Sequence, residues 1–301
     1  MFDVTIIGAG PAGLTSALYT SRAGLNTLVL EKAAPGGKVF LTDEVENYPG
    51  FKKIKGRELA NQMKESSLAF GANYQYGDVE EVTELDNGNY LVKTNMDEYE
   101  TRSVIVATGM VNKELGIPGE VEFQGRGVSY CAICDGNFFK EQDVAVIGGG
   151  NSALEEALYL ADICKSVTLI HRRDEFRAEQ YIVDKVLKKE NINIIYDTVG
   201  VEVKGEEVVN GLVVENVKTK EQQTLDIKAV FIYIGFIPMT GYFDNLNITD
   251  ENHNIKVDLN MRTDKPRIYG AGDVINKELR QITTAVNDGS IAAQSAINDL
   301  K

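Results

Sequence analysis

The fold is decided close to the N-terminus, where residues 4–13 read Val4-Thr5-Ile6-Ile7-Gly8-Ala9-Gly10-Pro11-Ala12-Gly13. The first four residues predict a short buried strand, and Leu14–Tyr19 carries apolar residues at helical spacing. In such a strand–loop–helix unit the first glycine permits a tight turn, the second lets the backbone approach a pyrophosphate, and the third lets the helix pack on the strand. The helix N-terminus then faces the phosphates. The alternative is a glycine turn without a ligand.

The residues that follow favour the ligand-binding interpretation. A second apolar strand, Thr27–Leu30, ends at Glu31, which lies 23 residues after Gly8. A dinucleotide site places a carboxylate that accepts from ribose hydroxyls about 20 residues after the loop. The N-terminal segment is therefore predicted to bind a dinucleotide.

A second unit of the same design begins in the middle of the chain. The strand Val144–Ile147 leads into Gly148-Gly149-Gly150-Asn151-Ser152-Ala153, which opens a predicted helix over Leu154–Leu160. The next strand, Ser166–Ile170, ends at His171, again 23 residues after the first glycine. Each unit closes with a late strand that ends in glycine, at Thr108-Gly109 and at Ile234-Gly235. The chain thus carries two nucleotide-binding units.

The two units differ where the ribose would lie. Glu31 would repel a 2′-phosphate, whereas the second unit presents His171-Arg172-Arg173 with Arg177 close behind. Guanidinium groups bind phosphate through paired hydrogen bonds, so the second unit is predicted to take NADPH. The alternative is that these arginines form a solvated helix start. The first unit suits FAD, and two unlike dinucleotides in one chain indicate a resident flavin and a transient reductant.

A cysteine pair, Cys131-Ala132-Ile133-Cys134, precedes the second unit. Such a pair indicates a redox dithiol or half of a metal site. A zinc site would need two more ligands, for which Cys164 and His171 are the candidates, whereas a free cysteine more often packs as a small apolar residue. Asp135 follows directly and is either a proton carrier or the first residue of an Asp-Gly turn, and the spacing leaves both interpretations open.

The C-terminal part returns to the first unit. A strand over Ile268–Tyr269 leads into Gly272-Asp273-Val274, and Arg280-Gln281 precedes a helix that runs to the end. A strand, a Gly-Asp turn and a helix start offer a carboxylate and N–H groups to a ligand. Asp273 is predicted to bind a ribityl hydroxyl, which makes the first domain discontinuous.

Composition excludes several classes of protein. The 301 residues carry a net charge of −14, which disfavours nucleic acid, because phosphate binding needs a basic face. Three Cys and two His exclude a disulfide scaffold. No apolar run approaches the roughly 20 residues that span a bilayer, and the strand at Val4 leaves no room for a signal peptide. We therefore expect no membrane contact and a cytoplasmic location.

Taken together, these motifs resemble those of the low-molecular-weight thioredoxin reductases, which belong to class II of the pyridine nucleotide-disulfide oxidoreductases. The resemblance runs nearly end to end and rests on motifs in family order: Gly8–Gly13, Gly36-Gly37, Glu44–Gly50, Cys131–Gly136, Gly148–Ala157, His171–Ala178, Gly272–Val274 and Arg280-Gln281. It implies an α/β fold of two Rossmann-like, FAD/NAD(P)-binding domains, the second inserted into the first. The FAD-binding domain would comprise residues 1–113 and 246–301, and the NADPH-binding domain with the redox dithiol residues 114–245.

The resemblance also implies residue roles and partners. It makes the protein a homodimer whose substrate is thioredoxin, with Cys134 as the flavin-side thiol, Cys131 as the thiol that attacks thioredoxin and Asp135 as the acid/base. The residues implied for FAD are Gly8, Gly10, Pro11, Ala12, Gly13, Glu31, Lys32, Gly36, Gly37, Lys38, Asn47, Thr108, Gly109, Gly272, Asp273, Val274, Arg280, Gln281 and Ile282. Those implied for NADPH are Gly148, Gly150, Asn151, Ser152, Glu155, His171, Arg172, Arg173, Arg177 and Gly235.

This chain departs from the family pattern at Lys38, where glutamine is usual, and at Met110 and Met239. Two alternatives to thioredoxin reduction stay open. The first keeps the electron path but delivers to another protein disulfide, on a glutaredoxin-like or peroxidase partner. The second is a non-catalytic module that binds a flavin or is stabilised by zinc.

Overall fold

The computed structural model describes residues 1–42 and 44–301 and divides into two compact units. Unit 1 comprises Met1–Val111 and Ile237–Lys301, and unit 2 comprises Asn112–Phe236. The chain crosses between them through strands β9 (Met110–Asn112) and β18 (Phe236–Pro238), which pair with each other. Unit 2 is therefore an insertion in unit 1, as expected.

The chain returns from unit 2 to unit 1 earlier than the sequence indicated. Residues 237–245, expected in the inserted domain, lie in unit 1, because the 3-10 helix Gly241–Leu246 contributes apolar side chains to its core. Phe243 is fully buried there, and Leu246 lies beside it. Backbone contacts reinforce this placement, since the Met239 carbonyl accepts a hydrogen bond of 2.7 Å from Thr108 Oγ1.

The central sheet of unit 1 has the strand order β5-β2-β1-β8-β7-β6, with β19 also paired to β8. Strands β5, β2, β1, β8 and β19 run parallel to their neighbours, whereas β6 and β7 form an antiparallel ribbon on β8. The strands are β1 Phe2–Ile7, β2 Thr27–Glu31, β5 Asn73–Tyr76, β6 Val79–Glu84, β7 Tyr90–Thr94, β8 Glu98–Val106 and β19 Ile268–Gly270. A separate small hairpin joins β3 (Glu44–Val45) and β4 (Ile54–Lys55).

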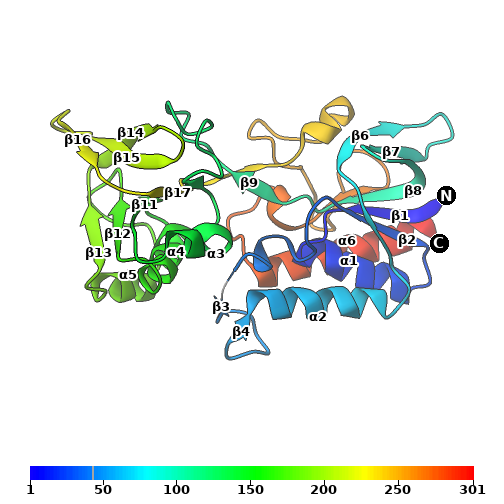
Figure 1. Ribbon diagram of the computed structural model, residues 1–301. Coiled ribbons are helices and arrows are strands. Elements are labelled where there is room, and N and C mark those ends of the chain that lie inside the picture. The colour runs from blue at the N-terminus through cyan, green and yellow to red at the C-terminus, as the bar shows by residue number, and fades with distance from the viewer. Residues whose placement is uncertain (43) are drawn as a thin grey trace. The chain divides into compact units, whose positions relative to one another are not determined.

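Both faces of this sheet are buried, which explains the nearly continuous apolar runs in its strands. Ile6 and Ile105 point toward the helices, and Ile7 and Val106 point to the opposite side. The helices are α1 Pro11–Arg22, α2 Gly56–Leu68 and α6 Ile282–Leu300, and they lie on one side of the sheet (Figure 1). Small residues on α1 and α6, such as Ala17 and Ala292, let the two helices pack closely.

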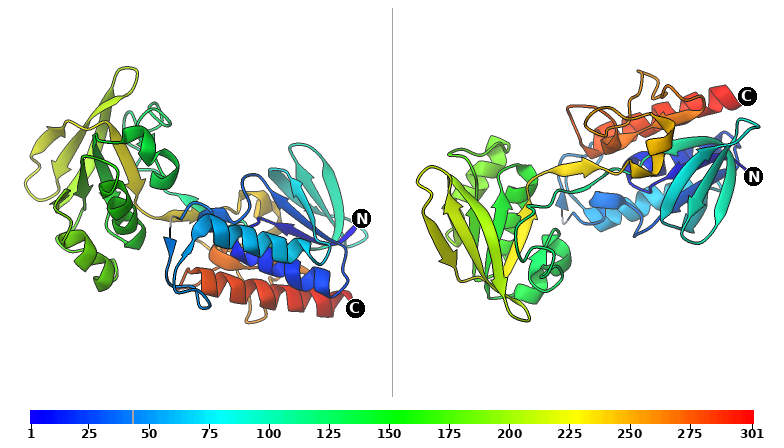
Figure 2. Two further views of the ribbon diagram at one scale, coloured as in Figure 1. Left: turned by 60° about the horizontal axis from the view of Figure 1, so that its bottom comes forward. Right: turned by 90° about the horizontal axis from the view of Figure 1, so that it is seen from above.

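Unit 2 repeats the layered design with a five-stranded parallel sheet of order β10-β17-β11-β12-β13 (Figure 2). One face is covered by helices and the other by an antiparallel sheet of order β14-β15-β16. The elements are β10 Val128–Ser129, α3 Ala132–Asp135, β11 Asp143–Gly148, α4 Asn151–Ala161, β12 Ser166–Ile170, α5 Gln180–Leu187, β13 Ile192–Ile195, β14 Thr198–Gly205, β15 Val209–Asn216, β16 Gln222–Leu225 and β17 Ala229–Tyr233.

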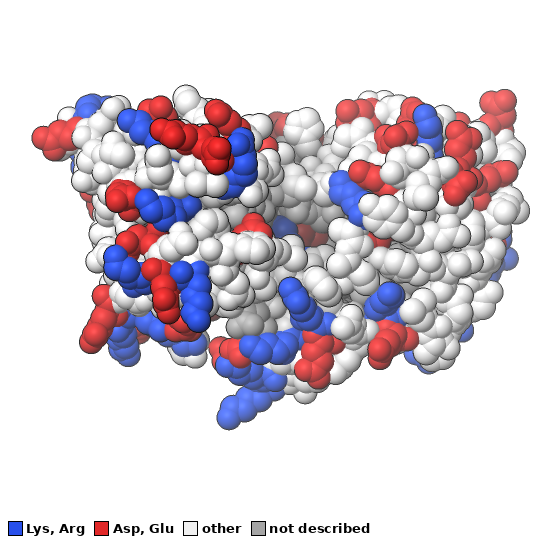
Figure 3. All heavy atoms as spheres, in the orientation of Figure 1, with Lys and Arg blue, Asp and Glu red and all other residues white. Residues whose placement is uncertain are grey.

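The predicted α/β class is confirmed, with one doubly covered sheet in each unit. Charged side chains of both signs are interspersed on the face drawn in Figure 3. Ion pairs of unit 2 include Lys165 with Asp143 and Lys218 with Asp197, each at 2.8 Å. Among the described residues, no helix is long and apolar enough to cross a membrane.

Candidate active site

The first glycine loop joins β1 to α1 and is shaped by close backbone contacts. Gly8 adopts a φ of 103°, and a Cβ there would overlap the carbonyl oxygen of Ala107 on the neighbouring strand end. A Cβ on Gly13 would overlap the carbonyl oxygen of Gly8. These two positions require glycine, the first for the turn and the second for the packing of helix on strand.

Gly10 has a different environment, because no heavy atom lies within 4 Å of the position a Cβ would take. Gly10 caps α1 without a side-chain hydrogen bond, and Pro11 is the first helical residue. The first helical turn therefore has no side-chain cap, and the space beside Gly10 is open at the helix end where an anion would be stabilised. This opening fits the pyrophosphate of a dinucleotide.

Glu31 lies beside this loop at the end of β2. Its carboxylate accepts hydrogen bonds from the N–H of Ala9 at 2.8 Å and from the N–H of Ala33 at 2.9 Å. The neighbouring Lys32 instead contacts Asp78 and Tyr242, each at 3.4 Å. Glu31 thus holds the loop while keeping lone pairs for further donors such as ribose hydroxyls.

A second segment of unit 1 closes on the same loop. Gly36 donates to the carbonyl of Ala9 at 2.7 Å, and Gly37 lies against Gly10, since its Cβ would be 3.3 Å from Gly10 Cα. Lys38 follows. Part of this residue reaches solvent, but the surrounding protein removes enough water from its ammonium group to lower its pKa to about 8. The charge of Asp273 acts in the opposite direction, and Arg280 adds to the lowering.

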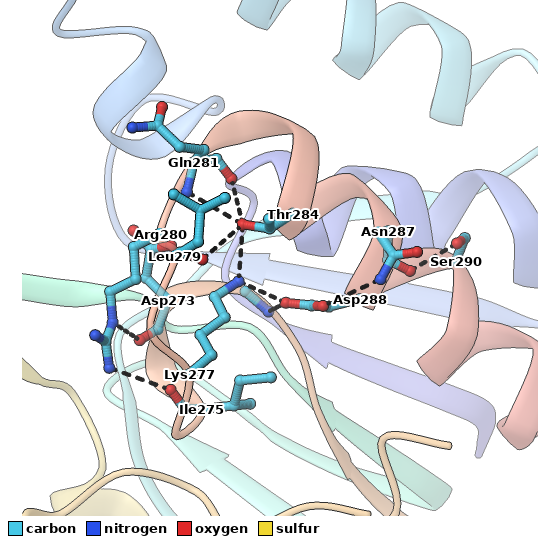
Figure 4. A network of polar contacts seen from close by, with 11 residues as sticks. Asp273, Ile275, Lys277, Leu279, Arg280, Gln281, Thr284, Asn287, Asp288 and Ser290 are labelled. Carbon is cyan, nitrogen blue, oxygen red and sulfur yellow. Dashed lines mark hydrogen bonds and ion pairs between the residues drawn. The ribbon is translucent and has the colours of Figure 1, made fainter. Parts of the chain in front are cut away.

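Asp273 and Arg280 belong to a polar network that orders residues 272–288 (Figure 4). Arg280 donates through Nε to the carbonyl of Asp273 at 3.2 Å and through Nη2 to Asn254 at 3.2 Å. Lys277 forms a buried ion pair of 2.6 Å with Asp288, whose Oδ2 also accepts from the N–H of Gly272 at 3.2 Å. The network holds the Gly-Asp turn beside α1.

The start of the helix that follows contacts Asn47, another residue predicted to bind FAD. Gln281 caps α6, which begins at Ile282, and its side chain accepts a hydrogen bond of 3.1 Å from Asn47. Gly272 lies against α1, because a Cβ on Gly272 would be 2.9 Å from Ala12 Cβ. Val274 points elsewhere: its side chain is fully buried in the core of unit 1, so only its backbone can face a ligand.

The second glycine loop, between β11 and α4, repeats these features. A Cβ on Gly148 would overlap the carbonyl of Tyr233, whereas no heavy atom lies within 4 Å of the Cβ position of Gly150. Gly150 caps α4 without a side-chain hydrogen bond. The loop therefore also fits a pyrophosphate. Gly235 follows β17 with a φ of 117°.

The side chain of His171 packs against this loop. Its ring is buried, and a Cβ on Gly149 would overlap it. Nε2 lies 2.9 Å from the carbonyl of Glu175, so this nitrogen carries the proton and donates. Burial lowers the pKa of His171, as do the nearby charges of the three arginines, so the ring is neutral.

The arginines lie in the loop between β12 and α5. Arg172, Arg173 and Arg177 are exposed, and none of them forms an ion pair with any residue that the structure describes. They do not start a helix, since α5 begins at Gln180. The N–H of Arg177 donates to the carbonyl of Gly149 at 2.8 Å, which ties the cluster to the glycine loop.

Three further predicted residues lie on α4, with different surroundings. Asn151 exchanges hydrogen bonds with Glu179, at 2.9 Å and 2.8 Å, so its side chain fastens the loop before α5. Ser152 and Glu155 lie on the same helix. The structure thus brings the second glycine loop and the arginine cluster, both predicted to bind NADPH, to the same edge of the parallel sheet.

The cysteine pair forms a disulfide at the start of α3. Cys131 caps this helix, and its Sγ accepts a hydrogen bond of 3.2 Å from the N–H of Cys134. Ser129 links the pair to the neighbouring acid: its hydroxyl accepts from the N–H of Cys131 at 3.0 Å and donates to Asp135 Oδ2 at 2.6 Å. The carboxylate of Asp135 is therefore held beside the disulfide.

The third cysteine is separate from this centre. Cys164 is buried in the core between the parallel sheet and α4, as expected, and burial raises its pKa to about 11. Residues 1–42 and 44–301 contain no group of three or more His, Cys, Asp or Glu side chains that could hold a metal. The zinc alternative has no ligand set in this part of the chain.

The spacing of motifs did not reveal four residues that organise these sites: Gly149, Ser129, Tyr233 and Glu156. Gly149 was visible as the middle of a triple glycine, and Ser129 stands two residues before the cysteine pair. Tyr233 and Glu156 had no local signal, because their contacts join distant parts of the chain.

A family model described as pyridine nucleotide-disulphide oxidoreductase matches residues 2–289. Thioredoxin reductase of Bacillus subtilis is 47% identical over 298 residues, which cover 98% of this chain and 93% of that protein. The chain belongs to the pyridine nucleotide-disulphide oxidoreductase family.

Solved structures support the same family assignment. The crystal structure of Lactococcus lactis thioredoxin reductase has a TM-score of 0.97 at 46% identity, covering 100% of this chain and 99% of that one. Thioredoxin reductase of T. acidophilum has a TM-score of 0.94 at 37% identity, covering 99% and 98%. The two Rossmann-like domains, one inserted in the other, are therefore confirmed.

Proposed function

We propose that this protein reduces the disulfide of thioredoxin with electrons from NADPH, which pass through FAD and the Cys131–Cys134 disulfide. The observation that carries this proposal is the Cys131–Cys134 disulfide in a chain with two unlike dinucleotide loops. FAD is assigned to unit 1 and NADPH to unit 2. Thioredoxin reductases similar to this chain over nearly its whole length support the choice of substrate.

The proposed FAD site uses the contacts of unit 1. The first turn of α1 would bind the pyrophosphate, Glu31 the ribose, and Asp273 the ribityl chain. Lys38, Asn47 and Gln281 would lie around the rest of the cofactor. When bound, FAD supplies the group that accepts a hydride from NADPH and passes two electrons to the disulfide.

The proposed NADPH site uses the second glycine loop. The first turn of α4 would bind the pyrophosphate, and Arg172, Arg173 and Arg177 the 2′-phosphate. His171 is assigned a supporting part, because its buried neutral ring packs on Gly149 and holds the loop that carries the arginines. Exposed guanidinium groups without an internal partner are free to bind a phosphate dianion.

The dithiol then carries the electrons to protein substrate. Two electrons and two protons convert the Cys131–Cys134 disulfide to two thiols. The Cys131 thiolate attacks the substrate disulfide, one new S–S bond forms, and the departing substrate thiolate takes up a proton. Cys134 then attacks Cys131 Sγ, which restores the internal disulfide and releases the second substrate thiolate. Asp135 is placed to carry a proton in these steps.

Two expectations about the assembled protein belong to this proposal. Resemblance to the family supports a homodimer. A redox dithiol works in a compartment that keeps thiols reduced, which supports a cytoplasmic location. Sedimentation of the purified holoprotein at micromolar concentration tests the first.

The deciding experiment is an NADPH oxidation assay with purified holoprotein and the organism's own small dithiol proteins. We expect yellow protein with one FAD per chain and rapid NADPH oxidation with thioredoxin. Preference for a glutaredoxin-like or peroxidase partner would move the acceptor but keep the electron path. Colourless protein that holds zinc would overturn the proposal.

A further inference from the structure

The hydroxyl of Tyr233 joins three elements of unit 2. Tyr233 is the last residue of β17, and its hydroxyl accepts a hydrogen bond of 2.8 Å from the N–H of Ala132, the first residue of α3. Glu156 on α4 also faces this hydroxyl, and its negative charge raises the pKa of Tyr233. One side chain thus connects the dithiol helix to the helix that follows the second glycine loop.

The proton of this hydroxyl has a defined position. Burial raises the pKa of Tyr233, and the negative charges of Glu156 and Asp135 raise it further, whereas the bond from Ala132 lowers it. Tyr233 therefore keeps its proton and accepts from the N–H of Ala132 through a lone pair. These two carboxylates are the charged groups that face the hydroxyl.

Packing around the contact leaves little freedom. Gly136, directly after α3, lies against α4, because a Cβ there would be 2.9 Å from Leu160 Cδ2 and 3.1 Å from Ile163 Cδ1. The carbonyl of Tyr233 lies against Gly148. The backbone of Tyr233 therefore supports the glycine loop, and its side chain reaches the dithiol.

We propose that Tyr233 is a positioning residue for the redox dithiol, whose hydroxyl fixes the Ala132 N–H and so holds α3 where the Cys134 N–H can stabilise the Cys131 thiolate. This inference rests on the proposed function. Helix α3 has only four residues and cannot be stable alone, so its geometry depends on such outside contacts. A thiolate gains from a nearby N–H donor, which lowers the pKa of the thiol.

Tyr233→Phe tests the inference because it removes the hydroxyl and keeps the ring. We expect α3 to loosen, the Cys134 N–H to lose its alignment with Cys131 Sγ, and the Cys131 thiol to titrate at higher pH. The measurement is the rate at which iodoacetamide alkylates Cys131 in dithiol-reduced holoprotein between pH 5.5 and 9.5, followed by peptide mass spectrometry. At pH 7 we expect the rate to fall severalfold, and at pH 9.5 to approach that of the unaltered protein.

Two further variants sharpen the test. Tyr181→Phe removes a hydroxyl from a side chain that is 62% exposed on α5, and its alkylation profile should be unchanged. Glu156→Gln keeps a polar side chain of the same size beside Tyr233 but removes the charge, and it should give a smaller shift in the same direction. If Tyr233→Phe fails to fold, the Glu156→Gln profile decides: no shift overturns the inference.

An unchanged alkylation midpoint in Tyr233→Phe would overturn the positioning role directly. The readout needs no thioredoxin, so it stays separate from the proposed function, which fails only if the unaltered protein does not turn over thioredoxin. Turnover gives a second check: the kcat of Tyr233→Phe should drop at pH 7 and recover at pH 9, while NADPH bleaches the FAD absorbance at the original rate.

Discussion

The hydroxyl of Ser129 donates a hydrogen bond of 2.6 Å to Oδ2 of Asp135 and accepts one of 3.0 Å from the N–H of Cys131. Asp135 is further held by its own N–H, which donates to the carbonyl of Cys131 at 3.1 Å. The sequence left Asp135 open between a turn residue and a proton carrier. These contacts keep its carboxylate at the dithiol, where a proton carrier is needed.

Ser129→Ala should therefore impair proton delivery at the dithiol. A hydrogen bond to a charged group contributes about 1.5–3 kcal/mol, so loss of the oriented carboxylate should lower thioredoxin turnover by about tenfold or more. Stopped-flow absorbance of FAD should show that its reduction by NADPH is unchanged. Ser166→Ala is the matched control, because it removes a similar bond of 2.7 Å to Asp143 at the start of β11. Equal turnover in the two variants would contradict the assignment.

Replacing either cysteine of the disulfide should separate the two halves of the reaction. Cys131→Ser and Cys134→Ser should each abolish thioredoxin reduction, because a lone thiol cannot complete the exchange and re-form the internal bond. NADPH should still reduce the bound FAD in both variants. Cys164→Ser, which alters the buried third cysteine, should keep turnover. Any measurable thioredoxin turnover in both single variants would refute a dithiol relay.

The parts of this structure that could be predicted are those with a local signal. The glycine loops and their strands follow from periodicity and from contacts within a few residues, and the strand Ser166–Ile170 is found with its predicted bounds. Phe243 packs on a sheet whose strands are far away in sequence, so the spacing of residues around it could not reveal its domain. The domain boundary was misplaced for this reason.

The side chains at the two sites also divide into those with a local signal in the sequence and those without one. Spacing indicated His171, and the family resemblance implied Asn151, for the second site, but neither indicated that each bonds to a neighbouring segment. The bond between Tyr233 and Ala132 joins residues 101 positions apart. Long-range pairing depends on how layers stack, which no short stretch of sequence encodes.

Removing the exposed arginines should relax the choice of nucleotide. Arg172→Gln with Arg173→Gln should raise the KM for NADPH strongly and leave that for NADH nearly unchanged, because charge-assisted bonds to a 2′-phosphate contribute a few kcal/mol in total, about 1.5–3 kcal/mol each. Steady-state kinetics with both nucleotides measures this ratio. Lys188→Gln with Lys204→Gln removes two exposed charges from the same unit and serves as the control. An unaltered ratio in the arginine variant would disprove the phosphate site.

Stability should depend on pH through His171. Burial lowers its pKa below the ordinary 6.5, so between the two values the unfolded chain binds more protons than the folded one. The free energy of unfolding therefore rises with pH in this window, and the contribution of the neutral ring is lost as pH falls below about 6.5. Thermal melts at pH 7.5 and 5.5 should show a larger fall in Tm for the unaltered protein than for His171→Gln.

His253→Asn is the control for that comparison, since His253 is the second of only two histidines and asparagine tolerates its φ of 62°. Its fall in Tm should match that of the unaltered protein. The assignment would be wrong if His171→Gln kept the full dependence.

Lys38 should make FAD binding depend on pH. Burial lowers the pKa of Lys38 to about 8, so its ammonium is present at pH 7 and mostly lost at pH 9. Because FAD is anionic, its dissociation constant should rise between these pH values by about three- to fivefold, as the loss of a partly exposed charge pair worth up to ~1 kcal/mol predicts. Titration of apoprotein with FAD, followed by quenching of flavin fluorescence, measures the change.

Lys38→Gln should bind FAD with the same constant at both pH values, whereas Lys52→Gln, which alters an exposed lysine, should retain the dependence. Parallel pH dependence in Lys38→Gln and the unaltered protein would show that Lys38 points away from the cofactor.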